Sequence, residues 1–222
     1  MWCRTLGVRN VDGRRQRGDR TRQAVAARAA ALASMDGLAG MTLSQLANAL
    51  GMTKSGIQAA YPTKEALQLA AVDAATQTFV GAVVAPVLGQ PEGLPRLTAL
   101  VEAWLSYVER RVFPGGCFMV ATLAEFDSHP GPVRDALAQA RSGWLGLLEQ
   151  QAAAGQAAGE IPASPPAASL AFEIDALLSA ANVSRNLGDD TAPLALARSL
   201  IAMRLGTDGD LGQLPPHPPE GR

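Results

Sequence analysis

Residues 41–67 read MTLSQLANALGMTKSGIQAAYPTKEAL and contain three helix starts and one tight turn. Thr42 is a suitable N-cap, and Gln45, three positions later, completes a capping box. Apolar residues then recur at helical spacing as far as Gly51, the residue type best able to leave a helix in a left-handed conformation. The stretch therefore predicts a short helix that begins at Leu43 and ends before Gly51.

A second short helix follows at once. Thr53 is a suitable N-cap, Pro62 prevents continuation, and Thr63 caps a third, longer helix. The outward face of the second helix carries Lys54, Ser55, Gln58 and Ala59. Two short helices joined by a glycine turn form the helix-turn-helix pattern, in which the second helix lies in the DNA major groove. An ordinary pair of core helices would carry the same capping signals.

The composition favours an all-helical protein. The chain has 222 residues, is 48% hydrophobic and only 5% aromatic, and shows no alternating run of β-branched residues. No signal peptide or membrane span is indicated, because polar residues and a proline interrupt the longest uncharged run, 74–91. Cys3 and Cys117 are too few for a disulfide framework and lack metal-ligand spacing. We therefore expect a cytoplasmic protein without cofactor or metal.

Charge is distributed unevenly along the chain. Through Lys64 there are ten basic residues against three acidic ones, a net +7, whereas the remainder carries nine against seventeen, a net −8. A basic end on an acidic body suggests that one region meets a polyanion. Residues 1–19 show no helical period, so we expect a disordered basic arm whose arginines track phosphates or enter a minor groove. The alternative is a solvated basic tail.

Residues 21–72, TRQAVAARAAALASMDGLAGMTLSQLANALGMTKSGIQAAYPTKEALQLAAV, resemble the N-terminal DNA-binding domain of the TetR-type (TetR/AcrR) transcriptional regulators. The resemblance rests on the glycine-containing corner ASMDGLAG, the Thr53-Lys54 start of the recognition helix and the run YPTKEAL. The segments GGCFMVATLAEFDSHPGPVRDAL and WLGLLEQQAAAGQAAGEIP resemble one subgroup of the family's ligand-binding domains more loosely. The family consists of all-helical homodimers, and that fold is expected here.

The resemblance implies DNA contacts at matching positions. Lys64, Tyr61 and the Thr42 hydroxyl would hold phosphates, and Arg22 would reach the backbone from the first helix. The base edges would fall to Thr53, Lys54, Ser55 and Gln58. Of these, Gln58 is chemically suited to adenine and Lys54 to guanine.

The recognition helix departs from the family pattern at three positions. Gly56 stands where Thr is usual, and Ala59 and Ala60 replace the common Tyr and His or Tyr. The helix would then make few direct contacts with bases. The affinity for DNA would depend more on phosphate contacts and therefore on the salt concentration. These residues support the alternative that the chain is a helical dimeric ligand- or protein-binding module that has lost sequence-specific DNA binding.

The rest of the chain predicts a second helical layer. We expect a DNA-binding domain over 20–66, a ligand-binding and dimerisation domain over 67–205, and a disordered Gly- and Pro-rich tail over 206–222. Two closing helices at about 166–187 and 191–205 are joined by GDD and must run antiparallel. In the family such a pair builds a four-helix dimer interface, so that two recognition helices read a palindrome.

A small-molecule effector would bind inside this second layer. The candidate apolar lining is Trp104, Phe118, Phe126 and Trp144, and the candidate polar contacts are Glu125, Asn182 or Arg185. Aromatic residues at helical spacing are equally expected as plain core. Glu125 and Asp127 lie two apart, do not share a helix face, and are interpreted as solvated. Cys117 is interpreted as a buried structural thiol rather than a sensor of electrophiles.

Catalysis has little support. The two histidines, His129 and His217, lie in a Pro-Gly loop and in the tail, and no nucleophile, phosphate-loop or metal motif is present. The sequence therefore predicts a ligand-responsive DNA-binding regulator, a repressor that a small-molecule effector releases from a palindromic operator. It is not expected to be an enzyme.

Overall fold

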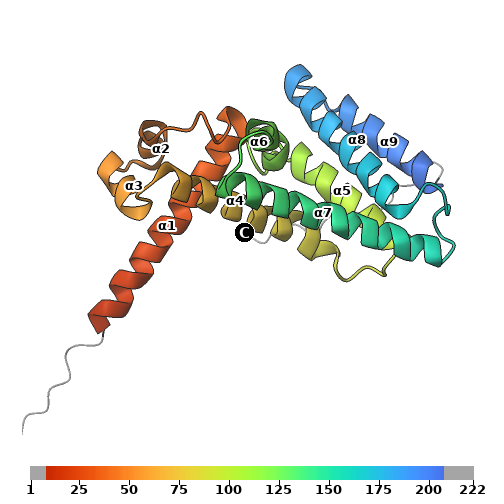
Figure 1. The fold of residues 1–222 in the computed structure, drawn as a ribbon, viewed down its shortest axis with the longest axis horizontal. Helices are drawn as coiled ribbons and strands as arrows, with labels where there is room; N and C mark the ends of the chain where they lie inside the picture. The colour runs from red at the N-terminus through yellow and green to blue at the C-terminus, as the bar shows by residue number, and fades with distance from the viewer. Residues whose placement is uncertain (1–8, 208–222) are drawn as a thin grey trace, which may run out of the picture.

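The computed structural model describes the chain from residue 9 to residue 207, and its side chains from residue 15. Within these residues the chain is helical and has no strand, which confirms the predicted all-helical class (Figure 1). The elements are α1 Arg9–Asp36, α2 Leu43–Leu50, α3 Lys54–Ala60, α4 Lys64–Phe79, η1 Val80–Val84, η2 Ala85–Val87, α5 Leu94–Glu109, α6 Phe118–Phe126, α7 Pro132–Ala157, α8 Ala167–Gly188 and α9 Ala192–Leu205.

The caps predicted around α2 are confirmed. The Thr42 side chain accepts a hydrogen bond from the Gln45 amide at 3.2 Å, while the Gln45 side chain accepts one from the Thr42 amide at 3.0 Å. Gly51 ends the helix with φ 62°, a left-handed conformation that costs glycine little. These caps satisfy amides that an eight-residue helix cannot satisfy by itself.

The caps of α3 and α4 also lie where the sequence predicts them. The Thr53 hydroxyl accepts from the Gly56 amide at 3.1 Å, and the Thr63 hydroxyl accepts from the Ala66 amide at 3.0 Å. Ile57 is the buried residue of α3 and packs into the same core as Leu46 of α2. Burial of these side chains fixes which face of α3 remains outside.

Helix α1 begins earlier than the sequence suggested. It starts at Arg9, so the expectation of a disordered arm over 1–19 is wrong for residues 9–19, and residues 1–8 lie outside the described part. The physical reason is helix cooperativity. Residues from Val25 onward pack into the core and nucleate the helix, and each further residue toward the N-terminus adds one hydrogen bond without a new nucleation cost. Residues 15–24 are exposed throughout, and α1 projects from the fold (Figure 1).

Helix α4 joins the two parts of the molecule. It packs against α1 on the side of the helix-turn-helix and against α7 on the other side, through buried residues such as Leu67, Ala71 and Val72. The stretch Lys64–Val87 is long and apolar enough to cross a membrane by length and composition alone. It packs against α1, α5 and α7, and one such stretch is weak evidence for a membrane span.

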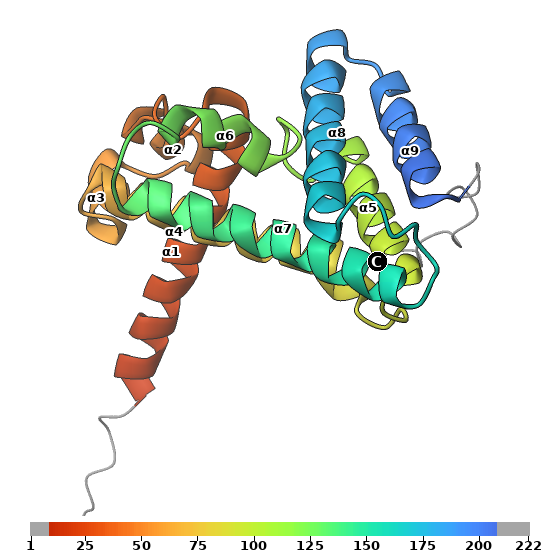
Figure 2. The same cartoon turned by 45° about the vertical axis from the view of Figure 1, so that its right-hand side comes forward.

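The two closing helices α8 and α9 lie side by side and run antiparallel, within one or two residues of the predicted bounds (Figure 2). Bidentate ion pairs tie α9 to its neighbours: Arg198 donates to Glu102 of α5 at 2.7 and 3.0 Å, and Arg204 donates to Glu173 of α8. Gly206 ends α9 with φ 74°. The predicted tail from residue 208 onward lies outside the described residues.

Candidate DNA interface and effector cavity

The outer face of α3 is polar and accessible. Four predicted base-contacting residues are exposed there, namely Thr53, Lys54, Ser55 and Gln58. Thr53 and Ser55 are 3.0 Å apart through their hydroxyl oxygens, because both lie at the start of the helix. Helix α3 lies at an edge of the molecule, away from α8 and α9 (Figure 1). A helix presented in this way can enter a groove without unfolding anything else.

The residues predicted to hold phosphates also hold the domain together. Lys64 donates to the carbonyl of Ala39 at 2.6 Å, and the Tyr61 hydroxyl donates to the carbonyl of Arg22 at 3.1 Å. Desolvation raises the pKa of Tyr61, so its hydroxyl keeps the proton that it donates. A lysine ammonium has three N–H donors, and the two that remain on Lys64 are available to a phosphate.

A cleft of about 370 Å³ separates α3 from α1. Gly56, Ala59 and Ala60, the three departures noted in the recognition helix, line its α3 side. The α1 side of the cleft carries Arg15 and Arg22. Sequence reasoning treated α1 before residue 20 as an arm and therefore missed this cleft.

An enclosed cavity lies between α4, α5, α6, α7 and α8. Three of the residues predicted for an effector pocket, Trp104, Phe118 and Trp144, line it. Phe79 and Tyr107 also line it and were missed from the sequence. Tyr107 follows Trp104 by three residues on α5, so helical spacing would have found it. Phe79 contacts Tyr107 and Trp144 edge to face, with ring centroids 5.7 and 5.2 Å apart.

One ion pair borders this aromatic cavity. Arg141 of α7 donates to Asp175 of α8 at 2.7 Å, and the Trp144 indole N–H donates to the other carboxylate oxygen at 3.2 Å. The Asp175 side chain is 13% exposed and that of Arg141 is 37% exposed. The pair therefore lies where the cavity meets solvent.

The remaining predicted pocket residues lie elsewhere. Phe126 lines a separate open groove, and Asn182 accepts a hydrogen bond from the Cys117 amide at 2.9 Å, so it fastens the start of α6. Arg185 donates to the carbonyl of Glu109 at the end of α5. None of these three is among the residues that line the enclosed cavity. Side-chain direction on α6 and α8, which spacing alone does not give, places these residues outside that cavity.

Cys117 is a free, buried thiol in the cavity wall. Burial raises the pKa of Cys117 to about 11, although amide hydrogen bonds from Met119 and Val120 lower it in part. A thiol with this pKa is protonated at neutral pH and is a poor nucleophile. This agrees with the structural interpretation of Cys117.

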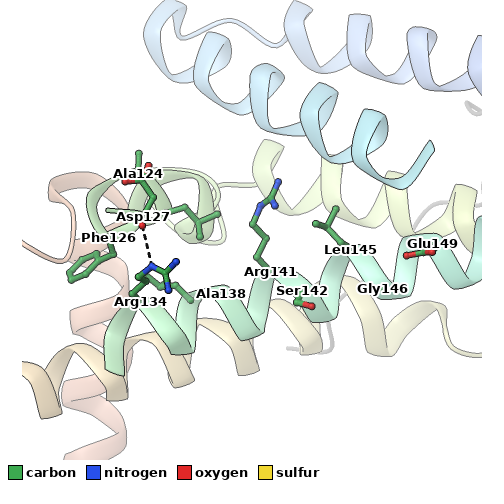
Figure 3. Close-up of a pocket in the computed structure, with 12 residues that line it drawn as sticks. Ala124, Phe126, Asp127, Arg134, Ala138, Arg141, Ser142, Leu145, Gly146 and Glu149 are labelled. Atoms are coloured by element: carbon green, nitrogen blue, oxygen red, sulfur yellow. Dashed lines mark hydrogen bonds between the residues drawn. The ribbon is translucent and has the colours of Figure 1, made fainter. Parts of the chain in front are cut away.

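The open groove has a volume of about 700 Å³ and lies between α6 and α7. Figure 3 shows Arg134, Arg141 and Glu149 along α7, with Asp127 facing Arg134 from the end of α6. Arg134 donates to the Asp127 carbonyl at 3.1 Å, the contact that is dashed in the figure. Arg141 and Leu123 line both the groove and the enclosed cavity, so the two spaces meet there.

Helix α6 also contacts the DNA-binding part directly. The Glu125 carboxylate accepts a hydrogen bond from the Ala39 amide at 2.8 Å. The prediction that Glu125 is a solvated residue is therefore wrong. Gly37, with φ 77°, makes room for it, since a Cβ at this position would lie 1.7 Å from Glu125 Oε1. The connection between α5 and α6 is also held to α1, because the Gly115 amide donates a hydrogen bond to the Ser34 hydroxyl at 3.0 Å.

Within the described residues, no group of three His, Cys, Asp or Glu side chains is placed to hold a metal ion.

Comparisons with known proteins agree with this architecture. Residues 93–201 match the model of the tetracyclin repressor-like C-terminal domain. A TetR transcriptional regulator from Chloroflexus aurantiacus is 28% identical, with a TM-score of 0.79 over 87% of this chain and 98% of that one. No curated protein sequence matches significantly.

Two further solved structures share the fold at lower identity. A TetR-family regulator from Cytophaga hutchinsonii is 22% identical, with a TM-score of 0.73 over 91% of this chain and 97% of that one. AibR, solved with isovaleryl coenzyme A and operator DNA, is 19% identical, with a TM-score of 0.70 over 83% and 97% of the two chains. Together with the helix-turn-helix and the domain match, these similarities lead to one conclusion: the chain belongs to the TetR-type transcriptional regulators, which are non-enzymatic DNA-binding proteins.

Proposed function

We propose that this protein is a repressor that binds a palindromic operator as a homodimer and is released when a small molecule enters the cavity between α4 and α8. One observation carries the proposal. Helix α6 forms a wall of the cavity through Phe118, Met119 and Val120, and at its other end Glu125 bonds the loop that precedes α2. A ligand in the cavity would therefore press on an element that holds the DNA-binding domain.

The DNA contacts would come from α3 and α1. Thr53, Lys54, Ser55 and Gln58 would meet base edges, with Gln58 on adenine and Lys54 on guanine. Arg22, Thr42, Tyr61 and Lys64 would contact the phosphate backbone. All of these residues except the half-buried Tyr61 are exposed, and this exposure, together with the basic exposed part of α1, supports the assignment.

The dimer would form through α8 and α9. Five large apolar side chains are exposed on these two helices, with exposed fractions between 46% and 85%: Phe172, Val183, Leu187, Leu196 and Met203. Phe172 and Val183 lie three helical turns apart and share one face of α8, and Leu196 and Met203 share one face of α9. Exposed apolar side chains gathered on adjacent helices are typical of an interface. A twofold pair would present two recognition helices to successive turns of the major groove.

Release would follow from unequal affinity for two conformations. An effector that binds better when α6 is displaced stabilises a state in which the two α3 helices are wrongly spaced for the operator. Coupling of 1–3 kcal/mol, about 5- to 150-fold in affinity, is typical of such systems. AibR, which shares the fold, was solved with both a coenzyme A thioester and operator DNA.

The test is reciprocal linkage. A DNA sequence that the purified protein binds is first selected from a random pool. Compounds are then screened for release of the protein from this DNA, and the fluorescence anisotropy of the labelled DNA measures the release. A true effector must lower DNA affinity by the same factor by which DNA lowers effector affinity. Compounds that bind the protein tightly and leave DNA affinity unchanged would contradict the repressor mechanism.

A second candidate function has its own observation. The cleft beside Gly56, Ala59 and Ala60 shows a recognition helix with few long side chains. This favours a ligand- or protein-binding dimer without sequence-specific DNA recognition. Uniform, purely salt-dependent binding to all DNA sequences would select this alternative.

A further inference from the structure

The enclosed cavity and the open groove are neighbouring spaces. They meet at Arg141 and Leu123, which line both. The cavity measures about 60 Å³ and the groove about 700 Å³. A ligand that occupies both therefore has a short buried end and an end that remains near solvent.

The cavity sets the size and polarity of the buried end. At roughly 10–15 Å³ for each water-sized group, a volume of this size admits about four to six such groups. Five aromatic rings surround it: Phe79, Trp104, Tyr107, Phe118 and Trp144. The buried end that fits is a small apolar group, such as one aromatic ring or a short branched chain.

The polar groups at the junction set the chemistry of the other end. Both oxygens of Asp175 accept hydrogen bonds, one from Arg141 and one from Trp144. A guanidinium carries five N–H donors, and Arg141 directs Nη2 alone to Asp175 among the described residues. Arg141 lines the groove and its side chain is 37% exposed, so a ligand in the groove can reach this side chain. Arg141 therefore has N–H donors beyond the one that Asp175 engages.

The charge of the ligand follows from these groups. A cationic ligand at Asp175 would lie beside the Arg141 guanidinium and would be repelled by its charge. A carboxylate can bind the unused edge of Arg141 and leave the Asp175 pair in place. Asp127 and Glu149 also line the groove, and Figure 3 shows them near its two ends with Arg141 between them. The Arg134 guanidinium is engaged with the Asp127 carbonyl and with Asp135.

We propose that the effector of this protein is an organic carboxylate, with its small apolar end in the aromatic cavity and its carboxylate on Arg141. This inference rests on the proposed function, because it takes the cavity to be the effector site. Free acids and acids linked to a larger carrier share the buried end, and the groove has room for the carrier. Only the free acid brings the carboxylate to Arg141.

The test uses three probes of one shape and different charge. Benzoate, benzamide and benzamidine carry the same six-atom ring with an anionic, a neutral and a cationic head. Each is titrated into the full-length protein, and binding is followed by the fluorescence of Trp104 and Trp144 and by isothermal calorimetry. Benzoate is expected to bind at least tenfold more tightly than benzamide, and benzamidine is expected to bind more weakly than both.

Two substitutions at the junction separate the charges. Arg141→Gln should weaken benzoate at least tenfold and abolish the preference for benzoate over benzamide. Asp175→Asn leaves the guanidinium without its carboxylate neighbour and should tighten benzoate binding several-fold. Arg134→Gln, which also lines the groove, is the matched control and should leave benzoate binding unchanged. If Arg141→Gln proves unstable, Asp175→Asn still tests the inference. Arg141→Gln leaves the buried Asp175 carboxylate without its partner, whereas Asp175→Asn removes that buried charge.

Four outcomes overturn the inference, three of them with these probes. These are a preference for benzamidine that Asp175→Asn abolishes, benzoate binding lost in Arg134→Gln and kept in Arg141→Gln, or failure of all three probes to bind. None of them contradicts the proposed function. That function is contradicted separately, if no compound of any charge changes the affinity for DNA. A thioester that binds with unchanged affinity in Arg141→Gln would assign the site to carrier-linked acids and overturn the carboxylate anchor.

Discussion

The carboxylate of Glu125 accepts a hydrogen bond from the Ala39 amide, 2.8 Å away and 86 positions earlier in the chain. Glu125 lies in α6, whose other residues line the cavity, and Ala39 lies in the corner between α1 and α2. The same corner receives Lys64 on the Ala39 carbonyl and Gln68 on the Leu38 carbonyl, at 2.6 and 3.0 Å. This corner is therefore the place where α4 and α6 both hold the DNA-binding domain.

Glu125→Ala should destabilise the protein by about 1 kcal/mol. A hydrogen bond to a charged group contributes roughly 1.5–3 kcal/mol, and partial exposure of Glu125 reduces that figure. Urea unfolding of the purified protein measures the change. Asp127→Ala is the control. In the described part of the chain the Asp127 side chain accepts a hydrogen bond only from the neighbouring Ser128 hydroxyl, so this variant should stay within about 0.5 kcal/mol of the parent.

Gly37→Ala should cost more than Glu125→Ala. A left-handed conformation costs a non-glycine residue roughly 1–2 kcal/mol, and the added Cβ would also displace the Glu125 carboxylate. In the Glu125→Ala background the second contribution is absent, so Gly37→Ala should then cost about 1 kcal/mol less. Equal costs in both backgrounds, measured by the same unfolding experiment, would show that Gly37 and Glu125 act independently.

The helices α2, α3 and α4 were predictable from the sequence because the residues that start and end them are local signals. Thr42, Gly51, Thr53 and Thr63 each specify a cap through residues within four positions, and all four caps lie where they were expected. The start of α1 was not predictable in the same way. Its exposed turns carry no apolar period, and their helical state depends on the packed residues that follow.

The candidate site was predictable only in part for a related reason. Aromatic spacing placed Trp104, Phe118 and Trp144 on inward faces, which proved to meet at one cavity. The Arg141–Asp175 pair spans 34 positions, and the Glu125–Ala39 bond spans 86. Partners so far apart in the chain are chosen by tertiary packing, and no local pattern in the sequence specifies them.

Cys117 should resist alkylation at neutral pH. Burial raises its pKa to about 11, so the reactive thiolate is rare until the pH approaches that value. In a Cys3→Ser variant, the iodoacetamide rate on folded protein should rise about tenfold per pH unit from pH 8 toward 11. Because the folded thiol holds its proton at a pH where the unfolded thiol loses it, its contribution to stability should fall over the same range. Rapid alkylation at pH 7 would refute the structural role of Cys117.

Substitution of the exposed apolar face should give monomers. Phe172→Lys and Leu187→Lys place charges on α8 residues that are 61% and 85% exposed, so folding of one chain should be little affected. Association through this face would be opposed by the desolvation of each ammonium group. Sedimentation velocity measures the change. Leu88→Lys, at a 55% exposed residue between η2 and α5, is the control and should remain dimeric.

Gln58→Ala and Arg22→Gln should affect DNA binding in different ways. Loss of the Gln58 amide should relax the preference at one base pair by about 1–3 kcal/mol. Arg22→Gln should weaken binding to all sequences alike and reduce the salt slope by about 1. Arg22 is the better probe of phosphate contact than Lys64, because the Lys64 ammonium also holds Ala39. Equal losses for Gln58→Ala on selected and random DNA would remove Gln58 from base readout.

Selection of bound sequences from a random double-stranded DNA pool, at moderate salt and with the full-length protein, tests the central claim most directly. Enrichment of a palindrome whose half-sites lie one helical turn apart, with a conserved adenine that depends on Gln58, is the expected result. A folded dimer that enriches no sequence would contradict the claim and would leave the ligand- or protein-binding module as the function of this fold.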